Sequence, residues 1–325
     1  MQQPASSEQK DQDGYQIKYR MKKCFVLCVM LMMGIVLSAQ TAKQDFERRY
    51  NLLVAKGGLA GVGVETLLEN WEKADSLNEA MLAARFDYYF TKAQSSDVVK
   101  RTSKKYLGMD PVLTIKDSLG TDVCYFQVSV FDDELYGEAL RAVDKAIAAY
   151  PKKLEFRFMK ANAYVAYEKE SPDMALVSLL SLAEEVAASK AGWEYEGEEI
   201  DPAFFPEAMQ EYCYTFFSID TPSAYEAFRV LSEKMMMLYP DNVEFLNNIG
   251  SYHLSVKKDF KSALKCYAKV LKSRPDDYIA IRNASLAARR MGNVKQEIKY
   301  LELLAQYGTE KDRMLANARL DSLRK

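Results

Sequence analysis

The feature that most constrains the fold of this 325-residue chain is a repeat of 34 residues near its C-terminus. Phe260 and Val294 are 34 residues apart, as are Tyr267 and Leu301, and each segment follows a helical stretch and a short turn. A sequence period of about 20–50 residues is typical of proteins built from stacked supersecondary units. A helical hairpin with apolar residues on two faces can bury only one of them by itself. We therefore expect a row of stacked helical hairpins.

The composition agrees with helices. The chain has only 14 Gly and 9 Pro. Few Gly and Pro, together with many Ala, Leu, Lys and Glu, favour long helices over a fold with many turns. Pro240 and Pro275, which are 35 residues apart, mark the ends of successive helix pairs. The sequence therefore predicts an all-α fold.

The segment from Val243 to Pro275 resembles one repeat of the tetratricopeptide repeat (TPR) family. Bulky and small residues occupy the family's positions on its two helices: Leu246, Ile249, Gly250, Phe260, Ala263, Tyr267 and Val270. One extra residue falls in the turn at 257–258. The next pair, from Tyr278, departs from the family at Glu297, where a small residue is usual. Residues 309–324 are expected to form a polar terminal helix that covers the last repeat.

The resemblance continues upstream, although with weaker matches. Residues 139–146 fit a second helix that closes at Pro151, and residues 223–239 fit another. Residues 64–74 and 79–90 resemble a degenerate pair, with Trp71 packed between helices. The resemblance implies a TPR-like α-solenoid of about five to six helix pairs. We expect N-terminal helices with a degenerate repeat in 41–110 and TPR-like repeats with a C-terminal capping helix in 131–325.

One segment, 111–130, interrupts the helices. Two short runs rich in β-branched and aromatic residues, 112–115 and 123–126, flank a polar stretch that contains Gly120. This pattern predicts an inserted β-hairpin packed on the helices, because two strands alone are marginally stable. A surface loop without regular strands is the alternative.

The N-terminus resembles an export signal. Residues 1–20 form a polar upstream extension, and 21–40 have a basic start, an apolar run and small residues near Gln40. This organisation is typical of a cleaved signal peptide. It predicts a periplasmic or secreted protein of Gram-negative type, with no membrane span after cleavage. A lipoprotein is the alternative, but Cys24 and Cys28 lie at the wrong end of the apolar run.

The sequence lacks the residue sets of common enzymes. His253 is the only histidine, and we find no phosphate-binding loop, nucleophile elbow, His-Glu-x-x-His or Cys-x-x-Cys motif. We therefore predict no enzyme, no cofactor and no metal site. The net charge of -2 offers no overall basic field, so no nucleic-acid partner is expected. Cys124, Cys213 and Cys266 are interpreted as buried thiols.

A protein or peptide is the expected partner. In the TPR family, ligands usually bind in a concave groove lined by the first helices of the pairs. The resemblance places these residues there: Asn247, Asn248, Ser251, Arg282, Asn283, Arg289 and Arg290. Such a set could hold a carboxylate or an acidic peptide, with bidentate contacts from arginine. The expected function is a non-catalytic protein-binding scaffold in the cell envelope.

A second function is suggested by residues 191–206, which are too many for a turn between repeats. This segment contains Trp193 and Tyr195 among acidic residues. Long loops often carry function, and exposed aromatic rings can stack on sugars. The alternative is therefore a carbohydrate-binding envelope protein in which Trp193 and Tyr195 bind a glycan.

Overall fold

The computed structural model describes residues 45–189 and 192–324. The predicted upstream extension (1–20) and signal peptide (21–40) lie outside the described residues. The chain divides into two compact units, the first ending at Thr91 and the second beginning at Lys92. Each unit is described by itself.

The first unit is held together by an aromatic core. Trp71 is only 1% exposed and stacks on Phe46, with ring centroids 5.8 Å apart. The hydroxyl of Tyr88 donates a hydrogen bond to the carboxylate of Glu65 over 2.7 Å. The prediction that Trp71 packs between helices is confirmed. The helical segments of this unit are 45–57, α2 (Val64–Ala74) and most of α3 (Glu79–Ala93).

A carboxyl group is buried in the same unit. Burial raises the pKa of Asp87, on α3, to about 6. Burial and the nearby charge of Asp87 raise the pKa of Tyr50 to about 12. An ionised carboxylate in this place is costly because it has lost much of its hydration.

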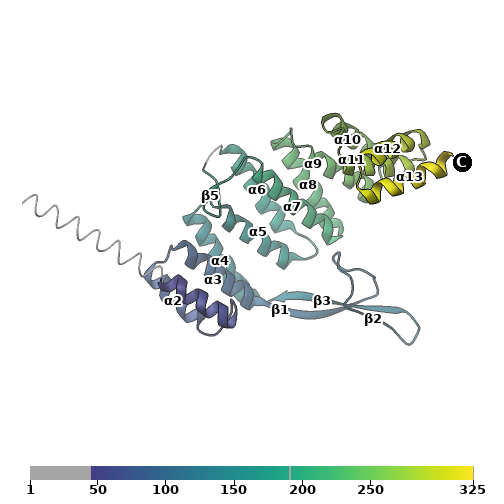
Figure 1. The fold of residues 1–325 in the computed structure, drawn as a ribbon. Coiled ribbons are helices and arrows are strands. Elements are labelled where there is room, and N and C mark those ends of the chain that lie inside the picture. The colour runs from purple at the N-terminus through teal and green to yellow at the C-terminus, as the bar shows by residue number, and fades with distance from the viewer. Residues whose placement is uncertain (1–44, 190–191, 325) are drawn as a thin grey trace, which may run out of the picture. The chain divides into compact units, whose positions relative to one another are not determined.

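The second unit contains a row of antiparallel helix pairs, drawn from teal to yellow in Figure 1. Within the pairs, α5 packs on α6, α7 on α8, α9 on α10, and α11 on α12, while α13 covers α12. The fold is a TPR-like α-solenoid, as the sequence predicted. The helices are α4 (Asp133–Ala149), α5 (Leu154–Glu168), α6 (Asp173–Ala188), α7 (Phe204–Ile219), α8 (Pro222–Leu238), α9 (Glu244–Ser251), α10 (Phe260–Ser273), α11 (Tyr278–Arg290), α12 (Val294–Tyr307) and α13 (Glu310–Arg324).

Close approach between helices requires small residues at their contacts. A Cβ atom on Gly250 of α9 would lie 2.6 Å from the ring of Tyr267 on α10. Tyr267 is fully buried, so its ring has no room to withdraw. Ala263, one turn earlier on α10, is also fully buried. Gly250 therefore sets the distance between α9 and α10.

The extra residue of this repeat lies inside a helix. We expected it in the turn at 257–258, but α9 continues directly into a π-helical turn, η1 (Tyr252–Lys257). The backbone amide of Asp259 then donates to the carbonyl of His253. A π-helical turn accommodates one additional residue without ending the helix. The expected position was therefore wrong by a few residues.

The inserted β structure is a three-stranded antiparallel sheet with the order β1-β3-β2. The predicted β-hairpin is present as β2 and β3, which are joined through Gly120 with a φ of 80°. β1 is an additional strand that lies before the predicted insertion of 111–130. It escaped prediction because it is polar and its residues are nearly all exposed. The strands are β1 (Gln94–Arg101), β2 (Leu113–Lys116) and β3 (Asp122–Phe131).

The connection between β1 and β2 anchors the sheet to the helices. Tyr106 packs on Phe126 of β3 and donates a hydrogen bond to Glu170, after α5, over 2.8 Å. Gly108 has a φ of 72°, and a Cβ atom there would lie 1.9 Å from the carbonyl oxygen of Ser218 on α7. The hairpin thus packs on the helices, as predicted, through a connection that only glycine fits.

We predict that Gly250→Ala destabilises the second unit by about 1–3 kcal/mol, because the new methyl group overpacks the Tyr267 contact. Gly137→Ala is the matched control. Gly137 lies inside α4 with only the flexible end of Arg141 nearby, so alanine there should stabilise the helix by about 0.5–1 kcal/mol. Urea denaturation followed by circular dichroism measures both. Equal effects of the two changes would contradict the close contact at Gly250.

We predict that Asp87→Asn removes a pH-dependent part of the stability of the first unit. The pKa of Asp87 is raised on folding from its ordinary value of 3.8 to about 6. Its contribution is therefore fully present below about pH 4 and is lost as the pH rises through 6. Relative to the variant, the wild type should gain up to about 2–3 kcal/mol between pH 7 and pH 4. Parallel pH dependences of their unfolding free energies would contradict this prediction.

Candidate functional site

Two of the residues predicted to line the groove are buried. Asn248 is 8% exposed, and its amide donates to Gln210 on α7 over 2.8 Å and to Ser232 on α8 over 3.2 Å. Asn247 is 6% exposed and donates to Asp277 over 3.4 Å. These asparagines connect neighbouring helix pairs. The predicted use of Asn247 and Asn248 as groove residues does not agree with this burial.

Two further groove candidates, Ser251 and Asn283, are half-buried. The Ser251 hydroxyl lies 3.3 Å from the hydroxyl oxygen of Tyr267 on α10. Ser251 thus pairs with a core residue of its own repeat.

The three arginines among the candidates are exposed. Arg282 lies 3.8 Å from the carboxylate of Asp312 on α13, with half of its side chain accessible. Arg289 and Arg290 occupy the last turn of α11, where positive charge interacts favourably with the helix dipole. Of the seven candidates, only the three arginines are exposed, while Asn247 and Asn248 are buried.

Of the two predicted aromatic loop residues, Trp193 is buried and Tyr195 is half-buried. Trp193 is 5% exposed and belongs to the main core of the second unit. Tyr195, in the short strand β4 (Glu194–Tyr195), packs on Phe204 with ring centroids 4.8 Å apart. Acidic neighbours suggested exposure, but β4 pairs with β5 (Glu198–Glu199), and this small hairpin leaves the acidic groups outside. The expectation that Trp193 is exposed was wrong.

Cys213 is a poor nucleophile. Cys124 and Cys213 are buried, as expected, and Cys266 is half-buried. Burial raises the pKa of the Cys213 thiol to about 12. A thiol with such a pKa stays protonated at neutral pH and is unreactive.

The C-terminal helix pairs carry an excess of basic residues that is not visible in the net charge of the whole chain. Residues 257–299 contain twelve Lys or Arg and four Asp or Glu, which gives a local net charge of +8. The remainder of the chain from residue 41 contains 27 basic and 39 acidic residues. The net charge of the whole chain averages these opposite contributions. Charge counted over separate segments would have revealed the basic region.

The acidic residues of this region are largely engaged within the fold. Asp259 and Asp277 cap the N-termini of α10 and α11 by accepting backbone hydrogen bonds. Glu297 is paired with Arg319 of α13. In residues 45–189 and 192–324, no carboxylate lies within ion-pair distance of six exposed lysines of this region. They are Lys261, Lys265, Lys269 and Lys272 on α10, and Lys295 and Lys299 on α12.

A groove lies between α10 and α12, with a volume of about 380 Å³. Leu271 and Leu303 are half-buried in it, and Tyr307 at one end is 40% exposed. Lys272 stands on the α10 side and Lys299 on the α12 side. The groove thus combines an apolar floor with positively charged edges. We name it the α10–α12 groove.

Glu297, the departure from the family pattern, has a structural explanation. Its carboxylate is 3% exposed and accepts two hydrogen bonds from the Arg319 guanidinium, over 2.7 and 3.3 Å. A buried charge is tolerated when a bidentate partner and hydrogen bonds replace its water. Glu297 therefore binds the capping helix α13 to the last repeat.

These features define a class: a TPR-like α-solenoid closed by a C-terminal helix. No group of three or more His, Cys, Asp and Glu that could hold a metal ion occurs in the part of the chain that the structure describes. In that same part, every helix is too short or too polar to cross a membrane.

Comparisons with known proteins add little to this description. No protein-family model and no curated protein matches the chain. A crystal structure of MamA is similar to this chain, with 18% sequence identity and a TM-score of 0.37. The aligned region covers 56% of this chain and 93% of the MamA chain. A second MamA structure has 18% sequence identity and a TM-score of 0.34. Its aligned region covers 55% of this chain and 88% of the MamA chain.

We predict that Arg319→Met loosens α13 and lowers the unfolding temperature by several degrees, because the Glu297 carboxylate is left buried without a partner. The double variant Glu297→Ala with Arg319→Met should recover most of the loss. Arg324→Met is the matched control, since Arg324 forms an exposed pair with Glu302 and exposed pairs contribute little. Calorimetry measures all three, and no recovery in the double variant would contradict the pairing.

Proposed function

We propose that this protein is a non-catalytic scaffold of the cell envelope that binds a protein or peptide partner through its TPR-like repeats. The observation that carries the proposal is the set of exposed basic side chains on the C-terminal helix pairs. Stacked helix pairs hold their surfaces rigidly, and rigid charged surfaces select partners by complementarity. The envelope location is supported by the signal-like pattern of 21–40.

The proposal favours a protein partner over a glycan. The glycan alternative relied on an exposed Trp193, and its ring is buried. The arginines Arg289 and Arg290 point instead to carboxylate chemistry, since guanidinium groups bind carboxylates with two hydrogen bonds.

The test is cross-linking of the chain from Thr41 onward in the periplasm of a Gram-negative host, followed by affinity capture and identification of bound proteins. We expect a dominant protein partner. Its recovery should fall about tenfold with Arg289→Glu and Arg290→Glu, which corresponds to about 1.4 kcal/mol of binding free energy. Both residues are exposed at the end of α11.

The matched control is Lys56→Glu with Lys104→Glu, which changes the charge equally at two exposed lysines outside the C-terminal helix pairs. Circular dichroism verifies that each variant is folded. Capture of no protein above background would contradict the proposed function. A partner retained equally by both variants would exclude the α11 arginines as its contact.

A further inference from the structure

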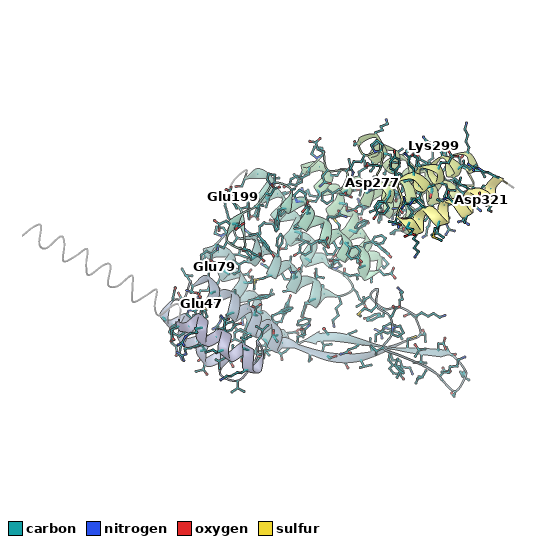
Figure 2. All side chains as sticks on the ribbon, in the orientation of Figure 1. Glu47, Glu79, Glu199, Asp277, Lys299 and Asp321 are labelled. Carbon is teal, nitrogen blue, oxygen red and sulfur yellow. The ribbon has the colours of Figure 1, made fainter. Side chains whose placement is uncertain are left out.

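We infer that the α10–α12 groove binds an acidic amphipathic helix of the partner protein. This inference rests on the proposed function and names the partner's chemistry. It also places the contact on the second helices of two successive pairs, α10 and α12. The groove that the family resemblance implied is lined by first helices instead. Figure 2 labels Lys299, one of the residues at the edge of the α10–α12 groove.

The floor of the groove supplies the apolar half of the recognition. Leu271 of α10 and Leu303 of α12 are partly exposed within it, and Pro275 closes the α10 side. Tyr307 leaves 40% of its surface accessible at the end of α12. Apolar side chains spaced at i, i+3 or i+4, and i+7 on one face of a helix fit such a groove.

The edges of the groove supply the charged half. Lys261, Lys265 and Lys272 are spaced by four and seven residues, so they lie along one side of α10. Lys295 and Lys299 are one turn apart on α12. Lines of lysine along both helices would attract a segment with acidic residues beside its apolar face.

Arg274 pairs with Glu244 and Asp277, and Arg282 with Asp312. The lysines at the groove edges form no ion pair within residues 45–189 and 192–324. Asp259, Asp277 and Glu297 are used for helix caps and for the pair with Arg319. Glu302, on α12, pairs with Arg324. Asp276, just after Pro275, is the remaining acidic residue of 257–299. This excess of positive charge is exposed beside an apolar groove, where acidic groups of a partner would neutralise it.

The groove favours a protein helix over the other polyanions. Nucleic acid is bound mainly through its phosphates and needs no apolar floor unless bases stack on aromatic rings. Tyr300 is only 6% exposed, so Tyr307 is the single accessible ring among the residues that line the groove. One ring does not form the series of aromatic side chains on which successive bases stack. A membrane would contact a wide and nearly flat surface, whereas this apolar area is narrow and recessed between two helices.

The experiment is a selection from a random library of displayed 16-residue peptides on the chain from Thr41 onward. The chosen peptides are then measured by fluorescence anisotropy. We expect acidic sequences with Leu, Ile, Phe or Met at helical spacing. Lys272→Glu with Lys299→Glu should weaken their binding at least about tenfold, and Lys56→Glu with Lys104→Glu less than about twofold.

A second variant keeps the charge and tests the floor. Tyr307→Ala removes a ring that is already 40% exposed, so the fold should be preserved. We expect this change to weaken peptide binding about fivefold, with the salt dependence unchanged. Binding of the selected peptides that is indifferent to both groove variants would overturn the inference.

The competing polyanions are measured with the same variants. A 30-nucleotide single-stranded DNA and vesicles containing one third phosphatidylserine serve as probes. Binding of either probe that depends on Lys272 and Lys299, without enrichment of acidic peptides, would overturn the inference. The inference would also be overturned if the selection enriched neutral or basic peptides, or if it enriched no peptide.

The inference and the proposed function fail differently. One outcome is a cross-linked partner that is lost with Arg289→Glu and Arg290→Glu but retained with Lys272→Glu and Lys299→Glu. That result would support the proposed scaffold function and contradict the inference about the α10–α12 groove. If neither a cross-linked partner nor a selected peptide is found, both the proposed function and the groove inference are contradicted.

Discussion

The stacking of helix pairs at close range is the constraint on which the second unit depends. Each pair has two apolar faces, and only a neighbouring pair can cover the second. Gly250 permits the approach of α9 to Tyr267 on α10, and Asn248 connects three helices through Gln210 and Ser232. Residues that seemed available for a ligand are therefore committed to the stack. A partner can contact only those side chains that do not pack between helix pairs.

Sequence periodicity predicted the α-solenoid, the capping helix and the β-hairpin, because each depends on local patterns of apolar residues. It failed where the outcome depends on distant contacts. Trp193 is buried next to the short β4–β5 hairpin, which no local sequence pattern predicts. The π-helical turn absorbs an extra residue that could equally have lengthened a loop. β1 is a strand only because β3 pairs with it.

The candidate site shows the same division. The family resemblance placed Arg282, Arg289 and Arg290 in a binding groove. All three are exposed, and their contact with a partner stays a prediction. Asn247 and Asn248 are buried, because the adjacent helix pairs cover their side chains. The basic groove was overlooked because the whole-chain charge of -2 averages over a strongly uneven distribution. Lysines on two helices become neighbours only when those helices pack in space.

The pair formed by Glu297 and Arg319 also bears on how such a chain can change over evolutionary time. Repeat arrays lengthen by internal duplication, and an ordinary unit can be copied anywhere in the row. A copy of the unit that carries Glu297 would be tolerated only beside a helix that supplies a matching guanidinium group. This carboxylate therefore couples its own repeat to the position next to α13.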